Sequence, residues 1–246
     1  MARLARGSSG QKHLRWGRQI LANMNAQAED NYLLQPNQKT ALQAEIVVLA
    51  GLVNNLFAPV SEYRTFLETA YTQIRAKQSV GDFLCDEAQR DAKGQLGPRK
   101  ATIAGVITGG LDAIFSNTPF SRVLTAGKKK TIAFAINAAS KIRPLTVLPN
   151  TPGLADALDK AAAVLQATVT QQETIIDPKR APLRVAVESA VFQLRDGLEK
   201  IDGRLRSHLT QEFIDSLYPE LARNNAALAD EADDEDDDTA LPANPS

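Results

Sequence analysis

Residues 187–209 read VESAVFQLRDGLEKIDGRLRSHL and contain the clearest helical pattern in the chain. Apolar residues recur in this stretch at steps averaging about 3.6, the number of residues in one helical turn. They are Val187, Val191, Leu194, Leu198, Ile201, Leu205 and Leu209. The pattern predicts one long helix that packs along most of its length. Gly197 and Gly203 each lower helix propensity by about 1 kcal/mol relative to alanine, and we expect them to mark close contacts between helices.

A similar pattern in the first half of the chain predicts a helical hairpin over residues 29–92. From Lys39 to Phe57 the apolar positions step by four, three, four and three, which lines one face of a helix. Pro59 interrupts this pattern. A second helix then follows, with one apolar side formed by Tyr63, Phe66, Ala70, Tyr71 and Ile74.

Residues 150–229 repeat this plan. Thr151 is a suitable N-cap, and Pro152 suits the first helical position, where its missing N–H costs nothing. An apolar stripe runs onward from there until Asp177–Pro178, which we expect to end the helix. A turn through residues 179–182 then leads into the helix quoted above. We therefore predict a second antiparallel hairpin.

Composition agrees with an all-α fold. The chain has 246 residues, of which 43% are hydrophobic and 23% charged, as in ordinary globular proteins. Between the hairpins, Ala101–Phe115 and Lys128–Ile142 predict two shorter helices, although the alternation over residues 102–107 also suits a strand. Ala101–Phe115 is shorter than the roughly 20 residues that a membrane-crossing helix needs, so we expect it to be buried. The predicted fold is two antiparallel helical hairpins packed with shorter central helices, followed by a disordered acidic C-terminal tail.

The net charge of −1 hides strongly segregated charges. Residues 1–28 carry five basic side chains and no acid, residues 93–149 carry nine basic side chains and one acid, and residues 230–246 carry eight acids and no base. We therefore divide the chain into five parts. These are a basic N-terminal arm (1–28), the first hairpin (29–92), a basic central segment (93–149), the second hairpin (150–229) and the acidic tail (230–246). The arm also has the composition of a mitochondrial presequence, but its composition favours a flexible or surface-bound basic arm.

The sequence offers little support for catalysis. Cys85 is the only cysteine, and its neighbours Asp82, Asp86 and Glu87 should raise the thiol pKa, so we expect a structural role. The two histidines, His13 and His208, lie far apart, and no metal-binding motif appears. Residues 125–131 resemble a phosphate loop but lack the first glycine and the Ser or Thr after the lysine. We predict no enzyme activity, no cofactor and no metal site.

The central segment contains the candidate binding residues. A polyanion, or the acidic tail of the same or a neighbouring subunit, could bind basic side chains there. The candidates are Arg99, Lys100, Arg122, Lys128, Lys129, Lys130, Lys141 and Arg143. The other interpretation is a packed helix whose lysines remain solvated. The sequence leaves these three interpretations open.

From these observations we expect a cytoplasmic scaffolding or assembly protein that acts through protein–protein contacts, including self-association. A protein partner or a homo-oligomer is expected, and integral membrane association is not. The alternative is a nucleic-acid-binding protein without sequence specificity, in which the acidic tail competes for the basic segment. In that case deletion of residues 230–246 should tighten DNA binding, and binding should depend steeply on salt.

Overall fold

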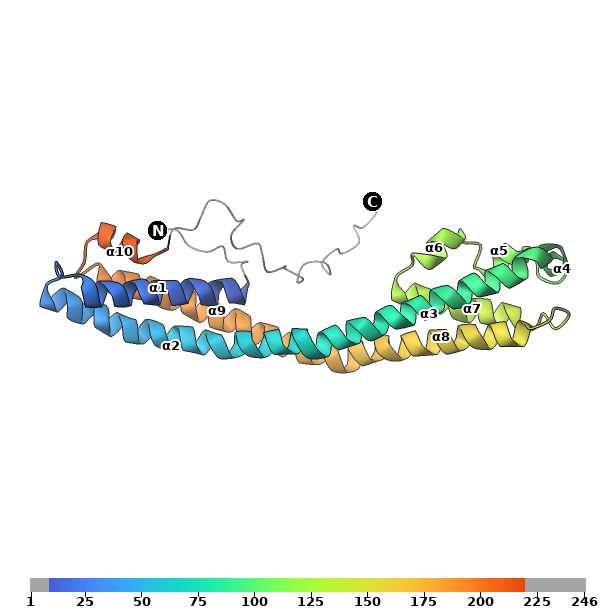
Figure 1. The fold of residues 1–246 in the computed structure, drawn as a ribbon, viewed down its shortest axis with the longest axis horizontal. Helices are drawn as coiled ribbons and strands as arrows, with labels where there is room; N and C mark the ends of the chain where they lie inside the picture. The colour runs from blue at the N-terminus through green and yellow to red at the C-terminus, as the bar shows by residue number, and fades with distance from the viewer. Residues whose placement is uncertain (1–8, 220–246) are drawn as a thin grey trace. The chain divides into compact units, whose positions relative to one another are not determined.

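The structure is a computed structural model that describes residues 9–219, and every regular element in this range is a helix (Figure 1). The predicted all-α class is confirmed. The acidic tail and residues 1–8 of the basic arm lie outside the described residues. The chain divides into two compact units, here called unit 1 (residues 1–58 and 188–246) and unit 2 (residues 59–187). Helices α2 (Pro36–Phe66) and α9 (Asp177–Leu205) each begin in one unit and end in the other.

Unit 1 contains α1 (Gly10–Asp30), the first part of α2, the last part of α9, and α10 (Gln211–Leu217). Ser9 caps α1, because its side chain accepts a hydrogen bond from the Lys12 backbone N–H at 3.3 Å. Leu14, Ile20 and Met24 are buried. The prediction of a basic arm is therefore wrong for residues 10–28. The prediction considered only the charge of these residues. They also contain an apolar face with helical spacing, and burial of that face stabilises the helix.

Glycines allow the helices of unit 1 to approach closely. A Cβ atom on Gly17 of α1 would lie 3.0 Å from Val53 and 3.3 Å from Leu194. On Gly197 it would lie 2.2 Å from Leu52 Cδ1, so the close contact predicted there is confirmed. The prediction for Gly203 is wrong, because a Cβ atom there would meet nothing within 4 Å.

The apolar row of α9 forms much of this core. Leu194, Leu198, Ile201 and Leu205 of α9 are buried. The helix ends at Leu205, where a turn begins, and Leu209 is buried beyond it. α10 is attached to α1 by a hydrogen bond from the Asn23 side chain to the Leu217 carbonyl at 3.0 Å.

Unit 2 is built around α3 (Thr72–Leu96), α7 (Lys128–Ile142) and α8 (Thr151–Gln171), which pack against one another (Figure 1). Short helices connect α3 to α7: η2 (Gly97–Arg99), α4 (Lys100–Ala104), α5 (Gly110–Ile114) and α6 (Phe120–Leu124). The core between the three main helices is rich in small side chains, including Ala135, Ala138 and Ala162. Small side chains permit close packing of helix backbones.

The break predicted at Pro59 and the turn predicted at residues 179–182 do not form. α2 continues through Pro59 and is joined to α3 by the π-helix η1 (Leu67–Tyr71), while the π-helix η3 (Gln172–Ile176) joins α8 to α9. A proline inside a helix costs about 3 kcal/mol, and burial of Leu56 and Val60 on either side of Pro59 offsets this cost. The two helices predicted in each hairpin are therefore parts of one continuous helical run, and the predicted hairpin packing is not confirmed.

The helices predicted in the central segment are confirmed only in part. α7 has the predicted bounds, Lys128–Ile142. The single helix predicted over Ala101–Phe115 is wrong, because α4 ends at Ala104 and α5 begins at Gly110, after a turn in which Gly109 adopts a φ of 89°. The alternative strand does not form in this part of the described chain either. Thr151 does not act as the N-cap of α8; its hydroxyl donates to the Leu145 and Leu148 carbonyls instead.

Candidate functional site

The structure distributes the predicted basic residues over unit 2. Arg99 and Lys100 lie where η2 meets α4, Arg122 lies on α6, and the other five lie at the two ends of α7. Lys128, Lys129 and Lys130 begin α7, whereas Lys141 and Arg143 stand at its far end, about 20 Å away at 1.5 Å per residue. The structure therefore does not gather the two groups on α7 into one cluster.

Several of these side chains already contact groups of the folded unit. Lys129 forms an ion pair with Glu173 at 2.6 Å, and Arg143 forms two, with Asp156 at 3.0 Å and Asp159 at 2.7 Å. The hydrogen bonds to Glu173 and Asp159 raise the pKa of Lys129 and Arg143.

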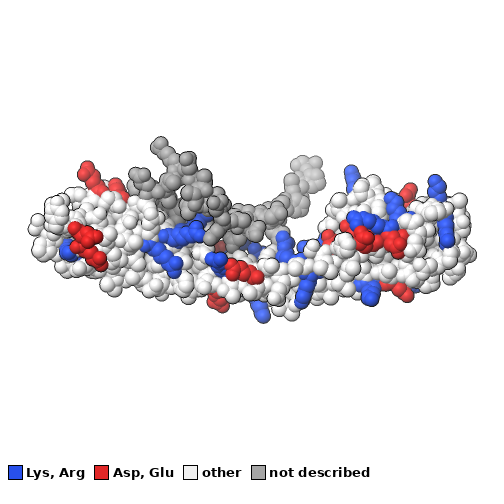
Figure 2. Space-filling model, in the orientation of Figure 1, with Lys and Arg blue, Asp and Glu red and all other residues white. Residues whose placement is uncertain are grey.

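Lys141 Nζ donates a hydrogen bond to the Ala113 carbonyl. Within the described residues no ion pair is recorded for Arg99, Lys100, Arg122 or Lys130. Figure 2 shows basic and acidic side chains interspersed on the visible face of unit 2 rather than a continuous basic area. A polyanion would therefore bind to a surface that carries both positive and negative charges, and only the separate basic side chains would attract it.

The inner face of α3 is polar for a helix in a core. Gln78 and Gln89 are both buried, and Gln78 donates to Gln172 Oε1 at 2.5 Å. Neither amide atom of Gln89 has a hydrogen-bond partner among the described residues. Burial raises the pKa of Asp86, and the nearby Asp82 raises it further, while Arg90 acts in the opposite direction. An unsatisfied buried polar group costs about 1–3 kcal/mol, so this face lowers the stability of unit 2.

Cys85 lies on the same inner face and is fully buried. Its thiol pKa is raised to about 11, first by burial and then by the carboxylates of Asp82 and Asp86. The sequence predicted the effect of the carboxylates but not the larger effect of burial. A thiol with so high a pKa is a poor nucleophile at neutral pH. No group of metal-ligating side chains occurs among residues 9–219.

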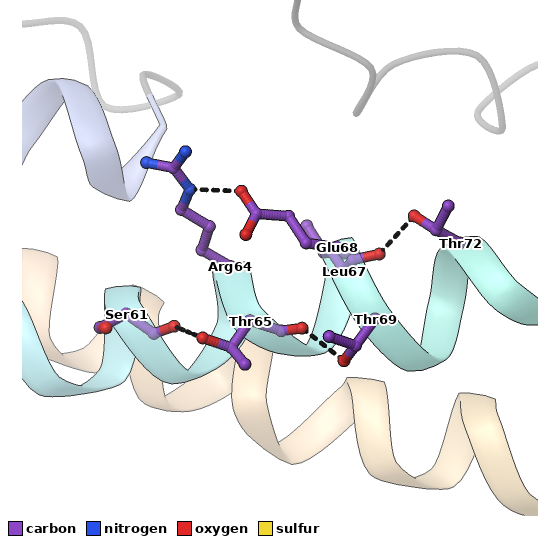
Figure 3. A network of polar contacts seen from close by, with 7 residues as sticks. All are labelled: Ser61, Arg64, Thr65, Leu67, Glu68, Thr69 and Thr72. Carbon is purple, nitrogen blue, oxygen red and sulfur yellow. Dashed lines mark hydrogen bonds and ion pairs between the residues drawn. The ribbon is translucent and has the colours of Figure 1, made fainter.

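A polar network accompanies the π-helix η1 (Figure 3). Threonine hydroxyls donate to carbonyls of the preceding turn: Thr65 to Ser61 at 2.9 Å, Thr69 to Thr65 at 2.6 Å and Thr72 to Leu67 at 2.7 Å. Such bonds satisfy carbonyls where the helical hydrogen-bond pattern changes. We therefore assign the network to the local structure of the helix rather than to a binding site.

On α9, Arg180 faces this region. Its Nε donates to the Tyr63 hydroxyl at 3.4 Å, and its guanidinium lies 4.7 Å from the centre of the Tyr71 ring. These contacts hold α9 against α2 and η1 within unit 2. The cation–π contact adds about 0.5–1 kcal/mol at a partly exposed site.

The outer face of α3 exposes large apolar side chains. Val80 is 58% exposed, Phe83 60% and Leu84 40%. Val164 on the neighbouring α8 is 39% exposed. This surface was not predicted from the sequence, because only one apolar stripe was assigned to each helix. The signal available in the sequence was a second row on α3 that includes Lys77, Val80, Leu84 and Glu87, at steps of three, four and three.

One stretch of continuous helix, Pro36–Ala104, contains an 18-residue window long and apolar enough to cross a membrane, with 28% of the window buried. A core helix of a soluble protein can also satisfy this test of length and composition. The absence of integral membrane association therefore stays a prediction from the sequence.

Comparisons of the chain with protein-family models, with curated proteins and with solved structures found no match. The fold and the surfaces described above define an all-helical protein with two units and an exposed apolar face on α3.

Proposed function

We propose that this chain is a non-enzymatic helical scaffold that assembles through protein–protein contacts, including contacts with another copy of itself. The observation that carries the proposal is the outer face of α3, where Val80, Phe83 and Leu84 are exposed on a helix whose inner face is already packed. Apolar side chains grouped within a polar surface are typical of interaction sites. Their burial against a partner would be favourable at about 25 cal/mol per Å² of apolar area.

The properties of Cys85 support the non-enzymatic part of this proposal. The thiol is buried and its pKa is about 11, which disfavours covalent catalysis by this residue.

Sedimentation velocity of the full chain over a wide concentration range tests the proposal. We expect the average mass to rise with concentration, because self-association follows mass action. Chemical crosslinking in cell extract tests association with other proteins in the same preparation. A strict monomer that also yields no specific crosslinked partner would overturn the proposal.

The alternative proposal is nucleic-acid binding without sequence specificity. It is favoured by Arg99, Lys100, Arg122 and Lys130, for which no ion pair is recorded within the described residues. It is weakened by Lys129 and Arg143, which a polyanion would have to remove from Glu173, Asp156 and Asp159. Its test is the salt dependence of DNA binding, described in the Discussion.

A further inference from the structure

The helix α3 carries a second regular row of residues besides the one that packs in the core. This outer row consists of Gln73, Lys77, Val80, Leu84, Glu87 and Asp91. All six side chains are exposed. The steps between them alternate between four and three, which is the heptad spacing of helices that pair along their length.

The outer row is separate from the contacts that build unit 2. The buried row of α3 includes Ile74, Gly81 and Cys85. A Cβ atom on Gly81 would lie 3.0 Å from the Leu165 Cα, so the Gly81 side of α3 meets the α8 backbone. The six side chains of the outer row remain exposed beside this contact, so the row is accessible to a partner.

The outer row is symmetric about residue 82. Val80 and Leu84 lie two positions on either side of it, Lys77 and Glu87 lie five positions away, and Gln73 and Asp91 lie nine positions away. When two identical helices pair antiparallel around a two-fold axis, each residue meets the one at the same distance on the other side of the axis. Val80 would then pack on Leu84 of the second copy, and Lys77 would meet Glu87.

We infer that a second copy of this chain covers the outer row, with the two α3 helices antiparallel and the two-fold axis near Asp82. This inference rests on the proposed function and names its partner, surface and register. Charge complementarity selects the second copy. An antiparallel pair joins Lys77 to Glu87 twice, whereas a parallel pair in register would place Lys77 against Lys77 and Glu87 against Glu87.

The same charges argue against a polyanion on this surface. Glu87 and Asp91 would repel nucleic acid and the acidic tail alike. Within α3, Glu87 already contacts Arg90, and Asp91 accepts hydrogen bonds from Gln95. Exposed pairs of this kind contribute little to stability, so Glu87 can also bind Lys77 of the second copy.

The centre of the contact is small and apolar. Val80 and Leu84 form its middle, and Phe83, the chain neighbour of Leu84, is also exposed. A contact of this size is typical of weak and reversible association. We therefore expect the dimer to dissociate on dilution, and the test must cover a range of concentrations.

Charge reversal in the full chain tests the register. Lys77→Glu and Glu87→Lys each create two like-charge contacts, and each variant alone should associate at least about tenfold more weakly than the wild type. In an equimolar mixture the two variants should pair with each other, because both contacts are then complementary. The double variant K77E/E87K should associate like the wild type. Sedimentation equilibrium measures these four samples and the wild type.

A second variant tests the apolar centre independently of charge register. Leu84→Asp should abolish association, because it places an unpaired carboxylate at the centre of the contact. The matched control is Val147→Asp, since Val147 is 68% exposed and also lies in unit 2, outside α3. This control should associate like the wild type. Far-ultraviolet circular dichroism of every variant checks that the helices remain folded.

A wild-type chain that is monomeric at all concentrations would overturn this inference. So would a dimer that both single charge reversals leave unchanged, or single variants that do not associate with each other. In the last two cases self-association survives, so the proposed function stands while the surface and register are wrong. The proposed function itself fails only when crosslinking also yields no specific protein partner.

Discussion

Gln89 lies on the inner face of α3 with its amide group buried, and neither of its polar atoms has a hydrogen-bond partner among the described residues. The sequence could not predict this arrangement, because a glutamine in a helical pattern is ordinarily placed on the solvent side. The free-energy cost of burying the Gln89 amide can therefore be inferred only from the packing of unit 2.

Gln89→Met should raise the free energy of unfolding by about 1–2 kcal/mol, because methionine has a similar volume and no amide to desolvate. Urea denaturation measures this change. Gln78→Met is the matched control on the same face. It removes the hydrogen bond to Gln172, so it should not stabilise the protein. A loss of stability in the Gln89 variant would mean that the amide is satisfied in solution.

Cys85 should be almost unreactive in the folded protein. A rise of its pKa from 9.0 to about 11 leaves roughly a hundredfold less thiolate at pH 8. Burial also blocks access to the sulfur. We expect labelling by a thiol reagent to be at least about a hundredfold slower in the native protein than in denaturing urea. Fast labelling of the native protein would contradict the buried position.

The same pKa makes stability depend on pH at the alkaline end. The folded-state pKa lies above the unfolded one, so the thiol contributes stability that is fully present below pH 9 and is lost as the pH rises toward 11. Cys85→Ala should remove this part of the dependence. Thermal denaturation of both proteins between pH 8 and about pH 11 measures it, and equal slopes would contradict the assignment.

At the level of helices, the sequence predicted periodicity well and the ends of the helices poorly. α7 has the predicted bounds because a glycine precedes its first turn and its apolar positions follow one face. Pro59 and Pro182 misled the prediction, since both lie inside helices. A proline disfavours the interior of a helix, but burial of apolar side chains before and after the proline can offset this cost. That burial depends on contacts between distant parts of the chain.

Two glycines of α3 should respond in opposite directions to substitution by alanine. Gly81→Ala would place a Cβ atom 3.0 Å from the Leu165 Cα, and backbone cannot move away cheaply, so we expect a loss of about 1–3 kcal/mol. Gly94→Ala meets nothing within 4 Å and should gain about 0.5–1 kcal/mol from helix propensity. Urea denaturation measures both. Stabilisation by Gly81→Ala would contradict the close packing of α3 on α8.

At the scale of the whole molecule, the segregation of charge remains the feature without an observed partner. The central segment was predicted from its composition alone, and composition does not reveal which lysines pair with distant carboxylates. Lys129 and Glu173 are 44 positions apart, and Arg143 reaches Asp156 and Asp159 on the next helix. The folded unit thus already neutralises part of the charge that appeared available in the sequence.

This pairing makes a quantitative prediction for the alternative function. Deletion of residues 230–246 removes eight acids and no base, so the net charge changes from −1 to +7 and binding to duplex DNA should tighten. If Arg99, Lys100, Arg122 and Lys130 provide the phosphate contacts, the slope of log affinity against log salt should be about −4. Lys130→Gln should reduce the slope by about one, whereas Arg143→Gln should leave it unchanged, because Asp156 and Asp159 hold that guanidinium. Fluorescence anisotropy at several salt concentrations measures these slopes. Binding that does not depend on salt, or that does not tighten when the tail is removed, would overturn the alternative and leave assembly as the role of this chain.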